Sequence, residues 1–174
     1  MKISRPTGNE YDVNSFQHRY IQAVTGDDAL QAMKENISIV ENFYKNIPPE
    51  KLLYRYAEGK WTPIEVLGHI IDCERILAYR ALCLARGEQQ SLPGFEEDAY
   101  VAATNFNKQS LRSLLLHYKA VRKANILLFK TLTAREIKRT GIANNKPYSA
   151  KTFIWLIAGH ELHHLNILRE RYLL

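Results

Sequence analysis

Apolar residues recur every three to four positions along four long segments of the chain, the spacing that places them on one face of an α-helix. The segments run from Asp27 to Ile47, from Thr62 to Arg86, from Lys108 to Leu132 and from Ser149 to the C-terminus. No segment alternates apolar and polar residues over a sustained stretch, so we expect no β-strand. Because each amphipathic helix must bury its apolar face against the others, the pattern predicts an all-α fold, a four-helix bundle.

Local signals define the ends of the first two predicted helices. Pro48 and Pro49 stop the first one, because proline lacks a backbone N–H and clashes with the preceding turn. The second opens with Thr62-Pro63-Ile64-Glu65, which places an N-cap hydroxyl, a proline at the first helical position and a capping-box carboxylate in order. Gly87 is the expected C-terminal stop of this helix.

The segments between the helices divide the chain and point to a binding site. We expect residues 1–26 to form an irregular N-terminal arm and residues 27–174 to form the bundle domain. The connections 87–107 and 133–148 are long for a tight bundle, and long loops in compact domains often carry function. Tyr100 and Tyr148 in these loops, with Arg80 from the second helix, are the candidate substrate-binding residues.

Composition and charge narrow the class of protein. The 174 residues are 46% hydrophobic and 24% charged, values typical of one folded globular domain. The N-terminus lacks the apolar stretch of a secretory signal, and no apolar run approaches the roughly 18 residues of a membrane span, so we expect a cytoplasmic protein without a membrane partner. The net charge of +6 comes from scattered lysines and arginines, which does not favour nucleic acid as a partner.

Three of the six histidines lie within His160-Glu161-Leu162-His163-His164. A helix turns by about 100° per residue, so His160 and His164 lie within roughly 40° of each other, one turn apart, and can share a metal ion. The stretch also matches the H-E-x-x-H pattern of zinc peptidases, in which Glu161 is the general base. A metzincin needs glycine and histidine at positions 167 and 170, where this chain has Ile167 and Glu170, so proteolysis is not favoured.

A third metal ligand is therefore sought upstream, and His69 is the best candidate. It lies in an apolar stretch of the second predicted helix, where an unpaired imidazole is poorly satisfied. A core histidine with a hydrogen-bond partner is the alternative. We expect His163 to pack near the site without ligating. Asp72 either orients an imidazole or pairs with Arg75 or Arg80.

These residues give the chain a family resemblance. It resembles the DinB-like superfamily, in particular its YfiT-related metal-dependent hydrolases, through Lys60-Trp61-Thr62-Pro63 to Arg75 and through Gly159 to Asn166. Residues 5–11 and 19–21 of the arm and residues 92–100 of the loop add support. The resemblance implies a DinB-type bundle, commonly a homodimer, that holds a divalent metal, usually zinc or nickel, through His69, His160 and His164. Characterised relatives include transferases that add a low-molecular-weight thiol such as bacillithiol to electrophiles, and a thiol-dependent maleylpyruvate isomerase.

Three neutral imidazoles leave a divalent cation its full charge and an open fourth position. Such a centre ionises either a bound thiol or a bound water, with Glu161 or Asp72 as candidate catalytic proton acceptors. The resemblance favours thiol transfer to small electrophilic substrates over hydrolysis with metal-bound water. The third hypothesis is a non-catalytic stress-response or binding module with a structural metal. In that case Cys73, four residues after His69, closes the site as a fourth ligand.

Overall fold

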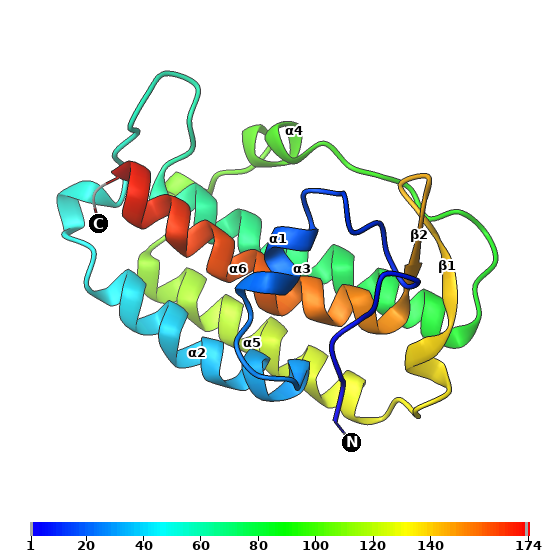
Figure 1. The fold of residues 1–174 in the computed structure, drawn as a ribbon. Coiled ribbons are helices and arrows are strands. Elements are labelled where there is room, and N and C mark those ends of the chain that lie inside the picture. The colour runs from blue at the N-terminus through cyan, green and yellow to red at the C-terminus, as the bar shows by residue number, and fades with distance from the viewer. Residues whose placement is uncertain (1, 173) are drawn as a thin grey trace.

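Four long helices form the bundle in the computed structural model, which describes residues 2–172 and 174 (Figure 1). They are α2 (Ala29–Lys45), α3 (Pro63–Arg86), α5 (Leu111–Lys130) and α6 (Ala150–Tyr172). Each begins and ends within three residues of its predicted segment, as far as the chain is described. The predicted fold class, an all-α four-helix bundle, is confirmed.

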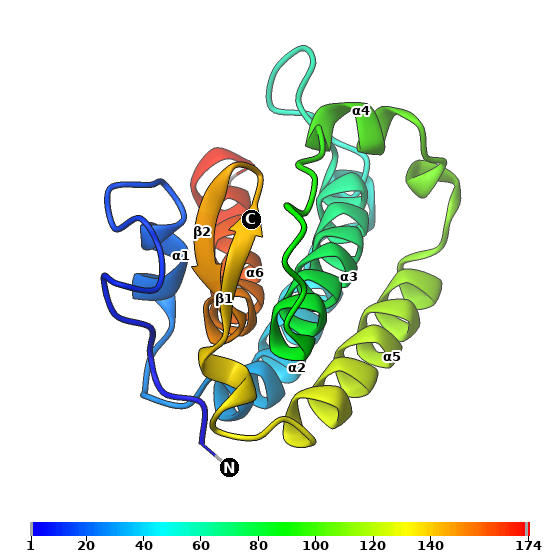
Figure 2. The same cartoon turned by 90° about the vertical axis from the view of Figure 1, so that its right-hand side faces the viewer.

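The helices do not follow one another around the bundle in chain order. Helix α6 packs against α2 and α3, and α5 packs against the same two helices, so the order around the bundle is α2, α6, α3, α5 (Figure 2). Helices that are consecutive along the chain, α2 with α3 and α5 with α6, therefore lie across the diagonal. The connections 46–62 and 131–149 cross the bundle, whereas the connection 87–110 joins the neighbours α3 and α5 and is longer still, because it contains α4 and a 3₁₀ turn.

The helix ends follow the chemistry of their sequences. The backbone N–H of Glu65 donates to the Thr62 hydroxyl (3.1 Å), and the Thr62 N–H donates to the Glu65 carboxylate (2.8 Å), so both bonds of the capping box are made. Gly87 ends α3 with a φ of 89°, a left-handed conformation that glycine adopts without steric cost.

A short β-hairpin precedes α6 and corrects the expectation that the chain has no strand. Strands β1 (Thr140–Ala143) and β2 (Lys146–Ser149) pair antiparallel. Asn144 and Asn145 turn the chain between them with φ values of 48° and 59°, a conformation that asparagine tolerates better than most residues. Strands of four residues that include a glycine and a proline are too short and irregular to show alternation, so the pattern missed them.

The N-terminal arm also differs from the prediction, because it contains helix α1 (His18–Ala23). This helix packs on the outer side of α6 (Figure 2). The approach is so close that a Cβ atom on Gly159 would lie 1.9 Å from the carbonyl oxygen of Tyr20. One turn earlier in α6, the indole N–H of Trp155 donates to the carbonyls of Ile3 and Ser4. The arm therefore contacts α6 at both of these places.

The connections contain further short helices. Helix α4 (Glu97–Ala102) lies in the long connection after α3, and single 3₁₀ turns occur at Pro49–Lys51, Phe106–Lys108 and Glu136–Lys138. Within the described residues, no helix combines the length and apolar character that crossing a membrane requires.

A buried polar layer divides the apolar core into two clusters. The guanidinium of Arg122, which is fully buried, donates to both oxygens of the Glu74 carboxylate (2.9 and 3.1 Å from Nε) and to the Glu161 carboxylate (2.8 Å from Nη1). The Tyr118 hydroxyl and the Asn36 amide also donate to Glu161 (2.5 and 2.7 Å). Both carboxylates are thus bound by protein donors, which a charge buried at this depth requires.

Candidate metal centre

The three predicted ligands meet at one point inside the bundle. Helix α3 supplies His69 and helix α6 supplies His160 and His164. The Nε2 atom of His160 lies 3.1 Å from Nε2 of His69 and 2.9 Å from Nε2 of His164. One ring nitrogen from each residue falls within 4.8 Å of the other two. The spacing of His160 and His164 predicts their proximity, because residues four apart lie about one helical turn apart on the same face.

The donor set fits a divalent transition metal. Ligation at about 2.0–2.1 Å in a tetrahedron places ligand nitrogens roughly 3.3 Å apart, close to the separations of the Nε2 atoms. In a neutral ring, Nε2 of His160 carries either one proton or one lone pair, so it can form only one good hydrogen bond, although two other Nε2 atoms lie within 3.1 Å of it. A cation bound by all three nitrogens resolves this conflict.

Burial keeps these imidazoles unprotonated at neutral pH. It lowers the pKa of His69 to about 4. Burial, reinforced by the neighbouring histidines, also lowers the pKa of His160 and of His164 well below the ordinary value. Since a metal binds the neutral ring, the protein pays little free energy to deprotonate its ligands.

Aromatic rings hold two of the imidazoles in place. The Trp61 ring packs against His69 with 4.7 Å between centroids. On the other side Tyr20 of α1 contacts His160 edge-on at 5.4 Å. His163 lies outside the cluster and packs against Tyr20 at 4.8 Å, where the sequence placed it.

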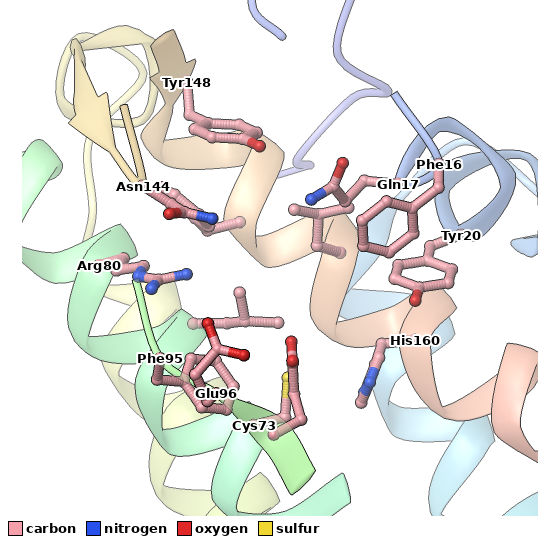
Figure 3. A pocket seen from close by; sticks show the side chains of 14 residues that line it. Phe16, Gln17, Tyr20, Cys73, Arg80, Phe95, Glu96, Asn144, Tyr148 and His160 are labelled. Carbon is pink, nitrogen blue, oxygen red and sulfur yellow. The ribbon is translucent and has the colours of Figure 1, made fainter. Parts of the chain in front are cut away.

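A cavity of about 270 Å³ opens beside His160 (Figure 3). Its walls come from α1, α3, α6, the β-hairpin and the segment before and at the start of α4. The polar residues that line it are Gln17, Tyr20, Cys73, Arg80, Glu96, Glu97, Asn144, Tyr148 and His160. Phe95, Phe153 and Leu156 add apolar surface, so the cavity suits a small ligand with both polar and apolar parts.

Two of the three predicted substrate-binding residues line this cavity. Arg80 and Tyr148 face it from α3 and from β2, and both are buried (Figure 3). Tyr100 is not among the lining residues: it is 48% exposed and packs against Phe95 with 5.1 Å between ring centroids. Its prediction rested on loop position alone, and α4 holds its ring at the surface.

The surroundings of the two predicted proton acceptors do not fit that role. Glu161 points into the buried polar layer, where Arg122, Tyr118 and Asn36 already bind its oxygens. Glu161 follows His160 by one residue in α6, so helical rotation turns its side chain by about 100° away from that of His160. Asp72 belongs neither to the cluster of three histidines nor to the residues that line the cavity. Burial raises its pKa, and the charges of Arg75 and of His117 on α5 oppose this shift.

Cys73 does not complete the centre as a fourth ligand, since the cluster within the described residues holds the three histidines alone. Its side chain lines the cavity instead. Burial raises the pKa of the Cys73 thiol to about 12, so it remains protonated at neutral pH. A metal held by the three histidines would therefore have a position left for a ligand from the cavity.

Several cavity residues were not singled out by the sequence. Gln17 and Tyr20 come from the arm, Glu96 precedes α4, and Glu97 is the first residue of α4. Nothing in their spacing relates them to the histidines, because their proximity depends on how the arm and the connection pack against the bundle. Tyr20, Glu96 and Glu97 lie within stretches that support the family resemblance, and no signal in the sequence points to Gln17.

The fold and the site together define a class of protein: a four-helix bundle in which α3 and α6 bring three histidines together. The sequence profile of the DinB superfamily matches residues 32–168, and the chain therefore belongs to this superfamily. Among solved structures it is similar to YfiT from Bacillus subtilis, which is described as a probable metal-dependent hydrolase with an unusual four-helix bundle topology. The match has a TM-score of 0.67 and 16% sequence identity over 95% of this chain and 98% of that chain. At this identity the likeness shows a shared fold. No curated protein sequence matches.

Proposed function

We propose that this protein is a metal-dependent enzyme that transfers a small thiol to an electrophilic substrate, with zinc or nickel held by His69, His160 and His164. The observation that carries the proposal is the convergence of three unprotonated imidazoles beside a cavity of about 270 Å³. When bound, a divalent cation supplies Lewis acidity that lowers the pKa of a thiol or water in the fourth position. A homodimer, as the resemblance implies, belongs to the same proposal.

Arg80 is the residue that orients an anionic group of the substrate. It is 8% exposed, and its Nη2 atom donates to the carbonyl of Pro93 (2.6 Å). Within the described chain no carboxylate lies within 4.0 Å of its guanidinium. The rings of Phe95 and Phe153, at 5.8 and 6.0 Å, offer it weak cation–π contacts. A buried guanidinium with unused donors gains strongly from a carboxylate or phosphate.

The hydrogen bonds that occupy the Glu161 carboxylate favour thiol transfer over hydrolysis. The pKa of a free thiol is about 8.5 and that of water is about 15.7, so a metal must lower the pKa of a thiol far less, and the thiol proton can leave to solvent before the attack. Glu161, the acceptor that the H-E-x-x-H pattern offers, is occupied by Arg122, Tyr118 and Asn36. Chemistry that needs no dedicated general base suits this arrangement best.

Hydrolysis is the second candidate, and Glu97 is the observation that favours it. Its side chain lines the same cavity as His160, and its charge acts on Tyr20, Cys73 and Arg80. An acidic side chain in this place is the group that would accept a proton from water. The description of YfiT as a probable hydrolase agrees with this alternative.

Substrate panels separate the two chemistries. Zinc-loaded and nickel-loaded protein is offered small thiols with a bromobimane electrophile and, separately, nitrophenyl esters and amides. We expect wild-type protein to consume the electrophile only when a thiol is present. The rate of this reaction should fall at least about 100-fold in His160→Ala. It should stay unchanged in His117→Ala, a control on α5. Thiol-independent ester or amide cleavage would favour hydrolysis, and turnover of neither panel would favour a non-catalytic module.

A further inference from the structure

Helix α1 forms one wall of the cavity, and it lies outside residues 32–168, the part matched by the superfamily profile. Tyr20 is the residue of this wall nearest the metal centre: its ring meets His160 edge-on, with 5.4 Å between centroids and 72° between planes. Gly159 makes this approach possible, because a side chain there would collide with the Tyr20 backbone. The wall is therefore a feature of this chain that the superfamily match does not cover.

The Tyr20 hydroxyl faces the cavity near His160 (Figure 3). Tyr20 is half-buried, and among the described residues its hydroxyl has no hydrogen-bond partner. A tyrosine hydroxyl is protonated at neutral pH, so it is available as a donor.

A second polar group on the same wall is also unsatisfied. Gln17, one turn before Tyr20, lines the cavity, and its Oε1 atom is buried without a hydrogen-bond partner among the described residues. Buried polar atoms are nearly always paired in folded proteins. Two such groups on one short segment, both facing the cavity, indicate a wall built to contact a ligand.

We propose that Tyr20 is a catalytic residue whose hydroxyl donates a hydrogen bond to the anionic group that takes the fourth position of the three-histidine centre. The inference rests on the proposed function and names the ligand class, an anion such as a thiolate. The donor lowers the free energy of the anion, because a hydrogen bond to a charged acceptor is stronger than one between neutral groups.

Anion binding to the cobalt-loaded protein tests this role without a known substrate. The visible spectrum of cobalt(II) is followed while azide is added to wild-type protein, to Tyr20→Phe and to Tyr79→Phe. Tyr20→Phe removes one oxygen and keeps the ring contact with His160, and Tyr79 is an exposed tyrosine on α3 that serves as the control. We expect the azide Kd to rise about tenfold in Tyr20→Phe and to stay unchanged in Tyr79→Phe, with equal cobalt affinity in all three proteins.

The outcomes separate this inference from the proposed function. If wild-type protein binds cobalt and Tyr20→Phe binds azide within twofold of wild type, the role of Tyr20 is overturned while the metal centre stands. If wild-type protein binds no cobalt, both proposals are overturned. A loss of cobalt affinity in Tyr20→Phe would also overturn the inference, because it would show that Tyr20 supports the ligands rather than the bound anion.

Discussion

Single residues decide the charge state of the metal centre. His69 and His160 are 5% and 6% exposed, and burial in an apolar bundle disfavours the imidazolium form of each ring. A protein that only needed three histidines for packing would gain nothing from aiming three Nε2 atoms at one another. The arrangement costs stability unless a cation binds, and this cost should be measurable as a pH dependence.

The first prediction concerns His69 in metal-free protein. Between pH 6.5 and about 4, the unfolded chain binds a proton at His69 that the folded chain does not, so acid favours unfolding. On lowering the pH from 7.5 to 5.5, wild-type protein should lose about 1 kcal/mol more unfolding free energy than His69→Gln. Urea denaturation after chelator treatment measures both values. An equal loss in the two proteins would show that burial does not depress this pKa.

The sequence predicted the clustering of the three histidines better than the surroundings of the two acidic residues. His160 and His164 could be paired from helical rotation alone, because an i, i+4 relation is fixed by backbone geometry. The environment of the Glu161 carboxylate depends on Arg122, which lies 39 positions away on another helix. No local pattern reveals such a partner, so the motif suggested a general base where the fold makes a buried ion pair.

At the scale of elements, the contact between α1 and α6 connects the arm to the metal centre. Six residues form α1, too few to be a stable helix without tertiary packing. Its periodicity was too short to detect, and the same holds for the four-residue strands. The long helices were predictable because burial on one face repeats over 17 to 24 residues.

Gly159→Ala tests that contact. The added methyl group would lie 1.9 Å from the backbone oxygen of Tyr20, so α1 must move away from α6. We expect faster amide hydrogen exchange in residues 16–24 and a destabilisation of about 1–3 kcal/mol, the usual cost of overpacking. Gly8→Ala is the matched control, since the nearest side-chain atom to its new methyl group is 3.4 Å away. Unchanged exchange in Gly159→Ala would show that the arm is not held there.

At the scale of the whole molecule, the diagonal crossings bring α3 and α6 side by side. This adjacency places His69 opposite His160, although 91 positions separate them in the chain. The hydrophobic pattern predicted four helices but carries no information on their order around the bundle, since each apolar face can pack against any other. The expectation that these two helices meet came from the search for a third histidine, which led to His69, and the family resemblance implies the same set.

Metal content of the purified protein tests the central claim most directly. Elemental analysis is made on wild-type protein, His160→Ala and His163→Ala after identical loading with zinc or nickel and removal of unbound ions. The three-histidine centre predicts one ion per chain in wild-type protein and in His163→Ala, and at least about a tenfold loss of metal affinity in His160→Ala. Full metal content in His160→Ala, or equal loss in the two variants, would contradict the account.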